Sequence, residues 1–292
     1  MRFELTDDQR DLERALEGLL AASDTVTVAR AWAEDDTGPG LGLWKRLADL
    51  GVTMLATEAS PVEVCVAFEA LGRHAVPGPW VESAAYLPVA LGHEIEGIAT
   101  VALPPHVPLA LDADIADHVY VGGTLVTDAV GARRVSVDRT RRLFEVTGSG
   151  ATDEAAFDLA VLATSAQLLG AGEQVLSDSV TYVKQRKQFG REIGSYQAIK
   201  HALADVRIGL DFARPLVHAA ALGEVSPSAA KVACADAAYL ASRTGLQVHG
   251  AIGYTAEFDL SLWVTKIRAL VTAWGTPAFH RARLLESLAG PA

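Results

Sequence analysis

The feature that most constrains the fold is a long apolar stretch that begins after Asp153 and continues to about Arg186. Its apolar residues recur at helical spacing, and Asp153 stands where a helix N-cap is expected. A second helix is expected to open at Ser195 and to run to about Leu222. Ser/Thr-Pro pairs then provide a cap and a first-turn proline for two more helices, which begin at Ser226-Pro227 and Thr276-Pro277. Long helices joined by short loops predict a C-terminal four-helix bundle.

Two regions of different character precede this bundle. Residues 1–94 are expected to be helical, with Thr6 and Gln9 in the capping-box pattern and a later helix over Val62–His74. Short runs rich in β-branched residues follow, separated by Gly, Pro and Asp, and they predict a small antiparallel β domain. The chain is therefore predicted to be mainly α with a small β domain. The expected division is an N-terminal helical domain at residues 1–94, a truncated β domain at 95–151 and the bundle at 152–292.

Composition narrows the class of protein. Half of the 292 residues are hydrophobic, which is enough for a sizeable core. A net charge of −11 argues against binding to a nucleic-acid backbone. Cys65 and Cys234 are too few for a disulfide framework or a four-cysteine zinc site, and no metal is expected. The N-terminus lacks the apolar core of a signal peptide, and the stretch Leu159–Gly172 is too short to span a bilayer. We expect a cytoplasmic protein without a membrane segment.

Three segments could carry function, and each also has an ordinary structural explanation. Three cations lie within four residues around Arg186, where they could grip a phosphate or merely favour a helix C-terminus. Gln247, His249 and Gly250 lie together, and Gly250 either ends a helix or lets a ligand approach the backbone. The third segment, around Thr276, needs no function beyond capping a helix.

Taken together and in this order, the segments resemble the acyl-CoA dehydrogenase family. The resemblance covers most of the chain, and the helix, β, helix order agrees with it. It rests on the segments ELTDDQRDL, LWKRLADLGV, ALGRHAVPGPW, RKQFG with SYQAIKHALAD, QVHGAIGYTAEFDLSLW, and WGTPAFHR. It implies an FAD-dependent oxidoreductase that takes a proton and a hydride from the α and β carbons of an acyl-CoA. It also implies that the flavin lies at a subunit interface.

The resemblance assigns candidate cofactor-binding residues to this sequence. In the family, the segments that correspond to RKQFG and QVHG here reach the adenosine and pyrophosphate end of a neighbouring subunit's FAD. Ala251 stands where a second glycine is common. The positions that match these two segments are Arg186, Gln188, Phe189, Gly190, Gln247, His249 and Gly250. Gln197 matches another position that contacts the nucleotide, and Thr276 is a further cofactor-binding candidate.

Departures from the family pattern are equally informative. The β region is short, has no Trp between residues 97 and 150, and lacks the loops that hold the isoalloxazine ring. The family's catalytic glutamate is replaced by Trp274, which cannot accept a proton. An alternative base position falls at about Ala160, and Asp158 is a weak substitute because it lies about 200° around the helix. Glu257 and Asp259 are more plausible as structural acids. No catalytic residue is therefore expected on this chain.

These departures resemble the small β subunits of heteromeric acyl-CoA dehydrogenases from steroid-degrading actinobacteria. That resemblance implies an α2β2 enzyme with a full-length partner, which supplies the flavin pocket and the glutamate. The further partners of this enzyme would be an acyl-CoA, which the resemblance suggests is steroid-derived, and an electron-transfer acceptor. Two alternatives stay open: a homo-oligomer that binds an acyl-CoA or nucleotide without redox chemistry, and, with less support, a flavin monooxygenase on the same fold.

Overall fold

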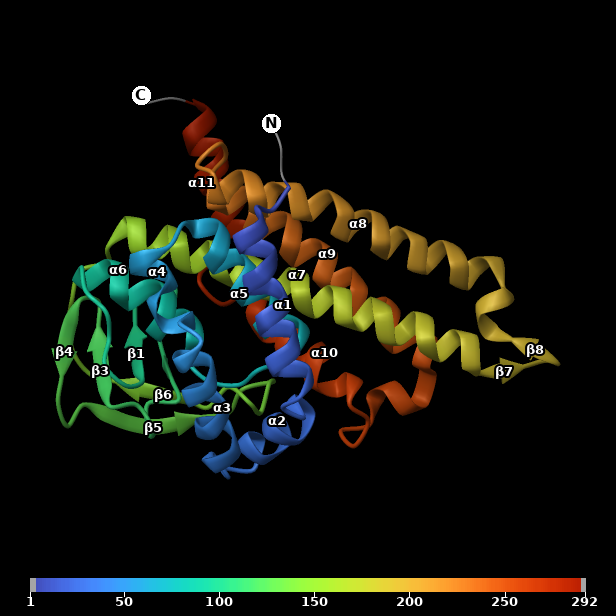
Figure 1. Cartoon of the computed structure of the whole chain (residues 1–292), viewed down its shortest axis with the longest axis horizontal. Coiled ribbons are helices and arrows are strands. Elements are labelled where there is room, and N and C mark those ends of the chain that lie inside the picture. Colours follow the sequence, from blue (N-terminus) through green and yellow to red (C-terminus); the bar gives the residue numbers. More distant parts are fainter. Residues whose placement is uncertain (1–3, 290–292) are drawn as a thin grey trace.

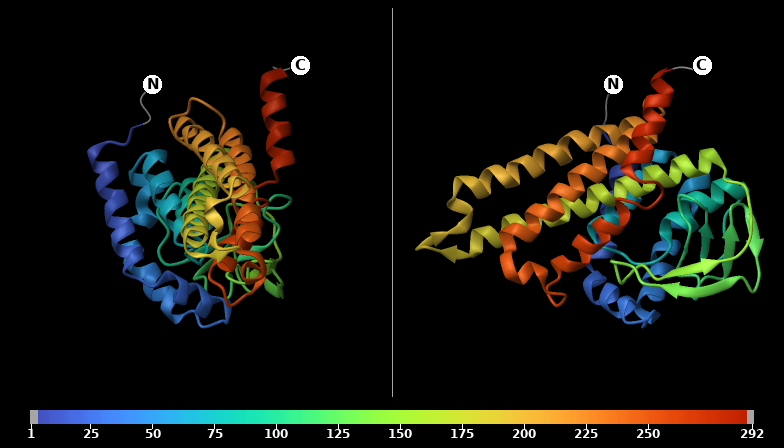
Figure 2. Two further views of the ribbon diagram at one scale, coloured as in Figure 1. Left: turned by 90° about the vertical axis from the view of Figure 1, so that its right-hand side faces the viewer. Right: turned by 180° about the vertical axis from the view of Figure 1, so that it is seen from behind.

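The structure is a computed structural model that describes residues 4–289. Helices come first along the chain, two small sheets follow, and a long helical bundle ends it (Figure 1). The bundle runs along the length of the molecule. The sheets lie beside one of its ends, and the N-terminal helices cover one of its sides (Figures 1 and 2). The model thus has the predicted class, mainly α with a small β region.

The N-terminal region is held by local capping that the sequence specifies. The Thr6 hydroxyl accepts from the Gln9 backbone, and the Gln9 side chain accepts from the Thr6 backbone, so the predicted capping box is confirmed. Ser60 and Glu63 form a second one. The elements are α1 (Asp7–Ala21), α2 (Thr25–Ala33), α3 (Gly38–Asp49), the 3₁₀ turn η1 (Val52–Met54), α4 (Leu55–Glu58), α5 (Pro61–Arg73), the π-helical turn η2 (Glu82–Tyr86) and α6 (Leu87–Leu91).

The β region forms two three-stranded sheets, ordered β1-β3-β4 and β2-β6-β5. The prediction of a purely antiparallel domain is wrong, because β1 and β3 pair in parallel, with Ala99 opposite His118. Parallel neighbours need a long connection, and residues 103–117 provide one that also contributes β2 to the other sheet. The strands are β1 (Ala99–Ala102), β2 (Ala110–Leu111), β3 (His118–Val121), β4 (Thr124–Val126), β5 (Val130–Arg134) and β6 (Leu143–Val146).

The bundle is built around α7 and α9. Asp153 caps α7 through the Ala156 backbone, and Ser226 caps α9 through that of Ser228, as predicted. The expected start at Ser195 is wrong: that hydroxyl donates to the Glu192 carbonyl in a 3₁₀ turn, and the helix begins two residues later. The elements are α7 (Glu154–Gln185), β7 (Lys187–Gln188), β8 (Arg191–Glu192), η3 (Ile193–Ser195), α8 (Gln197–Ala221), α9 (Pro227–His249), η4 (Gly250–Tyr254), α10 (Leu260–Leu270) and α11 (Pro277–Ala289).

Helix α10, which the sequence punctuation did not delimit, packs against both α7 and α9. Helix α11 packs on α9 and then stands away from the rest of the molecule (Figure 2). By length and composition α7 could cross a membrane, but 83% of its most apolar window is buried inside the protein. Burial of this kind is expected for the central helix of a packed bundle.

Close helix packing and ion pairs join the N-terminal helices to the bundle. A Cβ atom at Gly170 would lie 2.0 Å from the Glu69 carbonyl oxygen, so α5 and α7 can approach this closely only with glycine there. Nearby, Arg214 of α8 bridges Glu69 of α5 and Glu173 of α7. One continuous core contains residues of all three segments. The predicted division at residues 94 and 151 remains a prediction.

Candidate functional site

The hairpin after α7 presents the first candidate segment to solvent. Strands β7 and β8 are joined by Phe189 and Gly190, both in the left-handed region, at φ 53° and 79°. This turn suits the twist of a hairpin, but phenylalanine adopts the left-handed conformation only at a cost of roughly 1–2 kcal/mol. Phe189 is nonetheless 92% exposed. Strain combined with an exposed aromatic ring points to a function for this turn.

Arg186 is the C-cap residue of α7, and its side chain is exposed. Its backbone N–H donates to the Tyr182 carbonyl, and its own carbonyl accepts from Ile193. Within residues 4–289 its guanidinium makes no ion pair or hydrogen bond. The backbone is therefore fixed while the charge stays available to an anion, as a phosphate-binding role requires. Gln188 lies on β7, also exposed.

The segment after α9 supplies the second group. Gly250 ends the helix at φ 65° and ψ −141°, a conformation open essentially only to glycine. A Cβ there would meet nothing within 4 Å, so the backbone borders open space. Exposed Gln247 and half-buried Gly250 line a surface cavity of about 730 Å³ together with Arg243 and Tyr254.

His249 differs from its neighbours because its imidazole is buried. The ring stacks on Tyr182, with ring centres 4.3 Å apart, and its Nδ1 donates to the Gly245 carbonyl at 2.7 Å. Burial lowers the pKa of His249. The sequence analysis did not single out Tyr182, although it lies one helical turn before Arg186. This stacking ties the two candidate segments together.

The structure gathers most of the predicted cofactor residues at one end of the bundle. We call residues 186–197 and 247–254 the hairpin end; it lies on the right in Figure 1. Exposed Gln197 belongs to it as the first residue of α8. Thr276 does not. Its hydroxyl caps α11 by accepting from the Phe279 backbone, beyond the start of α9. The 23 residues of α9, about 35 Å of helix, lie between the two positions.

Around Trp274 the chain is packed rather than open. Trp274 is 1% exposed, and its ring lies 5.3 Å from that of Tyr86 and 6.0 Å from that of Phe157. Its backbone has φ 55°, a strained value for tryptophan. The indole faces Glu82, a carboxyl that is 1% exposed, and burial raises the pKa of Glu82. The residue that the sequence resemblance matches to the family's base is thus a buried aromatic ring.

Two buried polar side chains fix the loop that carries Trp274. Lys231 donates its ammonium hydrogens to the carbonyls of Leu270 and Ala273, at 2.6 and 2.7 Å. His280 donates from Nε2 to the Trp274 carbonyl at 2.9 Å, and its Nδ1 accepts from the Ser228 hydroxyl. Burial lowers the pKa of His280 to about 4 and that of Lys231 to about 7. We call Val271–His280 with these two supporting groups the Trp274 end.

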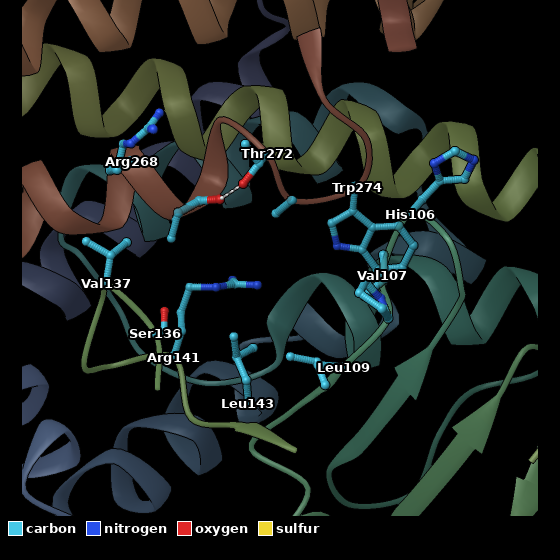
Figure 3. Close-up of a pocket in the computed structure, with 13 residues that line it drawn as sticks. His106, Val107, Leu109, Ser136, Val137, Arg141, Leu143, Arg268, Thr272 and Trp274 are labelled. Carbon is cyan, nitrogen blue, oxygen red and sulfur yellow. Dashed lines mark hydrogen bonds between the residues drawn. The ribbon is translucent and has the colours of Figure 1, made fainter. Parts of the chain in front are cut away.

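A cavity of about 470 Å³ lies on one side of this indole, and we call it the Trp274 pocket (Figure 3). Arg141 extends across it toward Trp274, whereas the Arg268 guanidinium lies over the Tyr239 ring. The sequence analysis missed Arg141. The available signal was five arginines within residues 133–142. The pocket is lined by His106, Val107, Pro108, Leu109, Ser136, Val137, Arg141, Leu143, Arg268, Ala269, Thr272, Ala273 and Trp274.

Of the acidic residues weighed as alternative bases, Asp158 and Asp259 have side chains engaged elsewhere, and Glu257 is held through its backbone carbonyl. Asp158 accepts from Arg283 at 2.7 Å. Asp259 accepts from Arg30 at 2.7 Å, and the Glu257 carbonyl accepts from the same guanidinium. None of these three acids lines the Trp274 pocket. Among residues 4–289, no cluster of three or more His, Cys, Asp or Glu side chains could hold a metal ion.

The two ends differ in how well they fit FAD. The hairpin end offers an unpaired guanidinium, an open glycine backbone and exposed amide side chains, a donor set that suits a pyrophosphate. The Trp274 end offers an indole against buried rings, and no carboxylate lines its pocket. The residues of the hairpin end therefore fit the nucleotide end of FAD, whereas the described residues that line the Trp274 pocket include no carboxylate.

Comparison with known proteins identifies the family. A family model of the acyl-CoA dehydrogenase C-terminal domain matches residues 148–289. Acyl-CoA dehydrogenase IpdE2 of Mycobacterium tuberculosis is 30% identical, over 96% of this chain and 94% of that protein. The IpdE2 of Mycolicibacterium smegmatis is 29% identical, over 96% and 98%.

Solved structures agree on the fold. The ChsE4–ChsE5 complex of Mycobacterium tuberculosis includes a chain with a TM-score of 0.80 and 20% identity, covering 100% of both chains. Butyryl-CoA dehydrogenase of Megasphaera elsdenii gives a TM-score of 0.82 at 18% identity, over 98% of this chain and 100% of that one. With caps, bundle, β region and near full-length relatives in agreement, the chain belongs to the acyl-CoA dehydrogenase family of oxidoreductases.

Proposed function

We propose that this chain is the smaller subunit of a heteromeric, FAD-dependent acyl-CoA dehydrogenase. Its hairpin end contacts the nucleotide part of an FAD that is bound mainly by a full-length partner subunit. The partner also supplies the catalytic glutamate. The observation that carries this proposal is the contrast between exposed, unpaired Arg186 and buried Trp274.

Several residues of the hairpin end would each contact a different part of the FAD nucleotide. Arg186 would donate to the pyrophosphate in a bidentate manner, while Gln188, Gln197 and Gln247 would donate from their amides. The open backbone at Gly250 would allow the nucleotide to approach closely. When bound, FAD supplies the hydride acceptor for desaturation of the acyl-CoA.

An interface with another subunit is supported by apolar side chains on the outer face of the bundle. Phe212 and Ile208 lie one turn apart on α8, 75% and 52% exposed. Tyr239 and Leu240 on α9 are also exposed, at 39% and 41%. Exposed large apolar groups on neighbouring helices are typical of surfaces that another protein covers. Two structural neighbours are themselves heteromeric complexes: ChsE4–ChsE5 and the steroid acyl-CoA dehydrogenase Tcur3481–Tcur3483.

The substrate class follows from the same relatives. One neighbour of known structure is a steroid acyl-CoA dehydrogenase. We therefore infer a steroid-derived acyl-CoA as substrate, an α2β2 assembly with two flavins, and an electron-transfer protein as acceptor. Because the flavin ring would lie on the partner, dehydrogenation would require both subunits.

Flavin content tests the proposal. The chain should be purified alone and together with a full-length acyl-CoA dehydrogenase encoded next to it. Alone it should be colourless, and the complex should be yellow with about one FAD per pair of unlike subunits. One FAD per chain in the isolated protein would overturn the heteromer. A stable, flavin-free homo-oligomer that does not bind the partner would favour the alternative of an acyl-CoA- or nucleotide-binding protein without redox chemistry.

A further inference from the structure

The cavity beside Trp274 has a chemical character that the proposed function does not explain. Its volume of about 470 Å³ lies within the range of small-molecule sites, about 300–1,000 Å³. Most of its wall is apolar, from Val107, Leu109, Val137, Leu143 and Trp274. Among the described residues that line it, none is acidic. The charged side chains among these lining residues are therefore cationic.

Arg141 is the unusual member of this wall. Its side chain is half-buried and extends across the cavity (Figure 3). Within residues 4–289 it makes no ion pair and no side-chain hydrogen bond. Its neighbour Arg142, by contrast, pairs with Asp112 and Asp114 at 2.9 and 2.8 Å. A half-buried guanidinium beside an apolar wall is costly unless an anion satisfies it.

Two acids interact electrostatically with Arg141, and both are shielded. Asp112 is fully buried and paired with Arg142, and it does not line the cavity. Glu82 interacts electrostatically with Arg141, but its carboxyl is 1% exposed and does not line the cavity. Burial raises the pKa of Glu82, which favours its neutral form. Arg268 adds a second cation at the rim, where it lies over Tyr239. The cavity thus keeps a net positive character.

We propose that the Trp274 pocket binds an apolar molecule with a single carboxylate, which Arg141 holds by a bidentate, charge-assisted pair. The apolar body would lie against Leu109, Leu143 and Trp274. This is a ligand site, not a reaction site. It depends on neither flavin nor the partner subunit, so it goes beyond the proposed function and can fail independently of it.

Decanoate and 1-decanol form a matched pair of probes, because they share a chain length and differ in charge. Binding to the full chain is measured by isothermal titration, below the concentration at which decanoate forms micelles. The wild-type chain should bind decanoate at least tenfold more tightly than decanol. Equal affinity for the two probes, or no binding of decanoate, would overturn the proposal.

Three variants locate the site. Arg141→Leu should weaken decanoate binding about ten- to a hundredfold, and Arg141→Lys should weaken it less. Ala269→Trp should abolish binding by filling the cavity. Arg139→Leu is the matched control: this exposed arginine lies two residues away and does not line the pocket, so affinity should be unchanged.

Thermal unfolding of each variant confirms that it is folded. Full affinity in folded Arg141→Leu, or in Ala269→Trp, would place the ligand elsewhere and refute the assignment. If Arg141→Leu does not fold, Arg141→Lys and Ala269→Trp still decide the question. FAD content of the complex is measured separately, so failure here leaves the heteromer proposal intact.

Discussion

The hairpin end carries residues that the sequence resemblance matches to FAD binding, and the Trp274 end carries the residue that it matches to the catalytic base. The two ends differ in how far these residues are exposed. At the hairpin end, Arg186 and Phe189 are exposed and unpaired within the described residues. At the Trp274 end, buried Lys231 and His280 donate to backbone carbonyls of the loop that carries Trp274, and the indole is buried in the core. The exposed groups of the hairpin end can serve another subunit, whereas the buried groups of the Trp274 end stabilise the loop that borders the Trp274 pocket. Of the residues that the resemblance matches to the family's site, Trp274 is therefore packed in the core while Arg186 stays accessible.

The largest effect is expected from restoring the family's acid at the Trp274 end. Trp274→Glu removes a buried ring and introduces a carboxyl close to buried Glu82. We expect a loss of about 3–5 kcal/mol in the free energy of unfolding, measured in urea. The isolated chain should gain no dehydrogenase activity. Trp274→Phe is the control and should lose less. Wild-type stability or new activity in Trp274→Glu would show that this end is still an active site.

The next effect concerns pH and the same loop. Burial holds the pKa of His280 at about 4 in the folded chain, against 6.5 for an imidazole in water. The unfolded chain therefore takes up a proton between pH 6.5 and 4 that the folded chain does not. The stabilisation is full above pH 6.5 and falls as pH drops toward 4, by up to about 3 kcal/mol.

His280→Gln isolates this contribution from other histidines whose pKa is also lowered, such as His249. Glutamine does not titrate, so the variant should lose less stability between pH 6.5 and 4 than the wild type. Urea unfolding at several pH values measures the difference. Parallel curves for the two proteins would mean that His280 is not held neutral by the fold.

At the hairpin end the expected effect is on binding instead of folding. Arg186→Ala should weaken retention of FAD by the complex about ten- to a hundredfold, as expected for losing a charge-assisted pair of about 1.5–3 kcal/mol. Arg186→Lys should restore only part of it. Subunit association should persist. FAD affinity and association are measured separately.

Arg281→Ala is the control for that experiment, since it removes an exposed arginine of α11 that pairs with Asp236. It should leave FAD affinity unchanged. Unchanged affinity in Arg186→Ala would remove the strongest residue from the proposed site and leave Arg186 as a helix cap worth a fraction of a kcal/mol.

The smallest effect is expected at Asp158. This acid is half-buried and paired with Arg283 at 2.7 Å, away from the Trp274 pocket. Asp158→Asn should leave turnover of the complex nearly unchanged and cost under about 1 kcal/mol of stability. A loss of turnover above about a hundredfold, the scale of a general base, would make Asp158 the base and erase the contrast between the two ends.

Local features of the fold could be predicted because they depend on neighbours in the sequence. Thr6 with Gln9, Asp153 and Ser226 cap helices through backbone groups two or three residues away. The start at Ser195 failed because its hydroxyl bonds backward to Glu192. Helix α10 was missed because Asp259, which precedes it, makes no capping bond and pairs instead with distant Arg30.

The amino-acid sequence by itself determined the family, the helix and β regions, and the residue types at the candidate site. Only the tertiary structure decided which of those residues share an end of the bundle. It separated Thr276 from Gly250 by the length of α9 and buried His249 against Tyr182. It also placed Arg141 opposite Trp274 (Figure 3). The physical reason is range: caps act over two or three residues, whereas a pocket depends on how elements distant in the chain pack together.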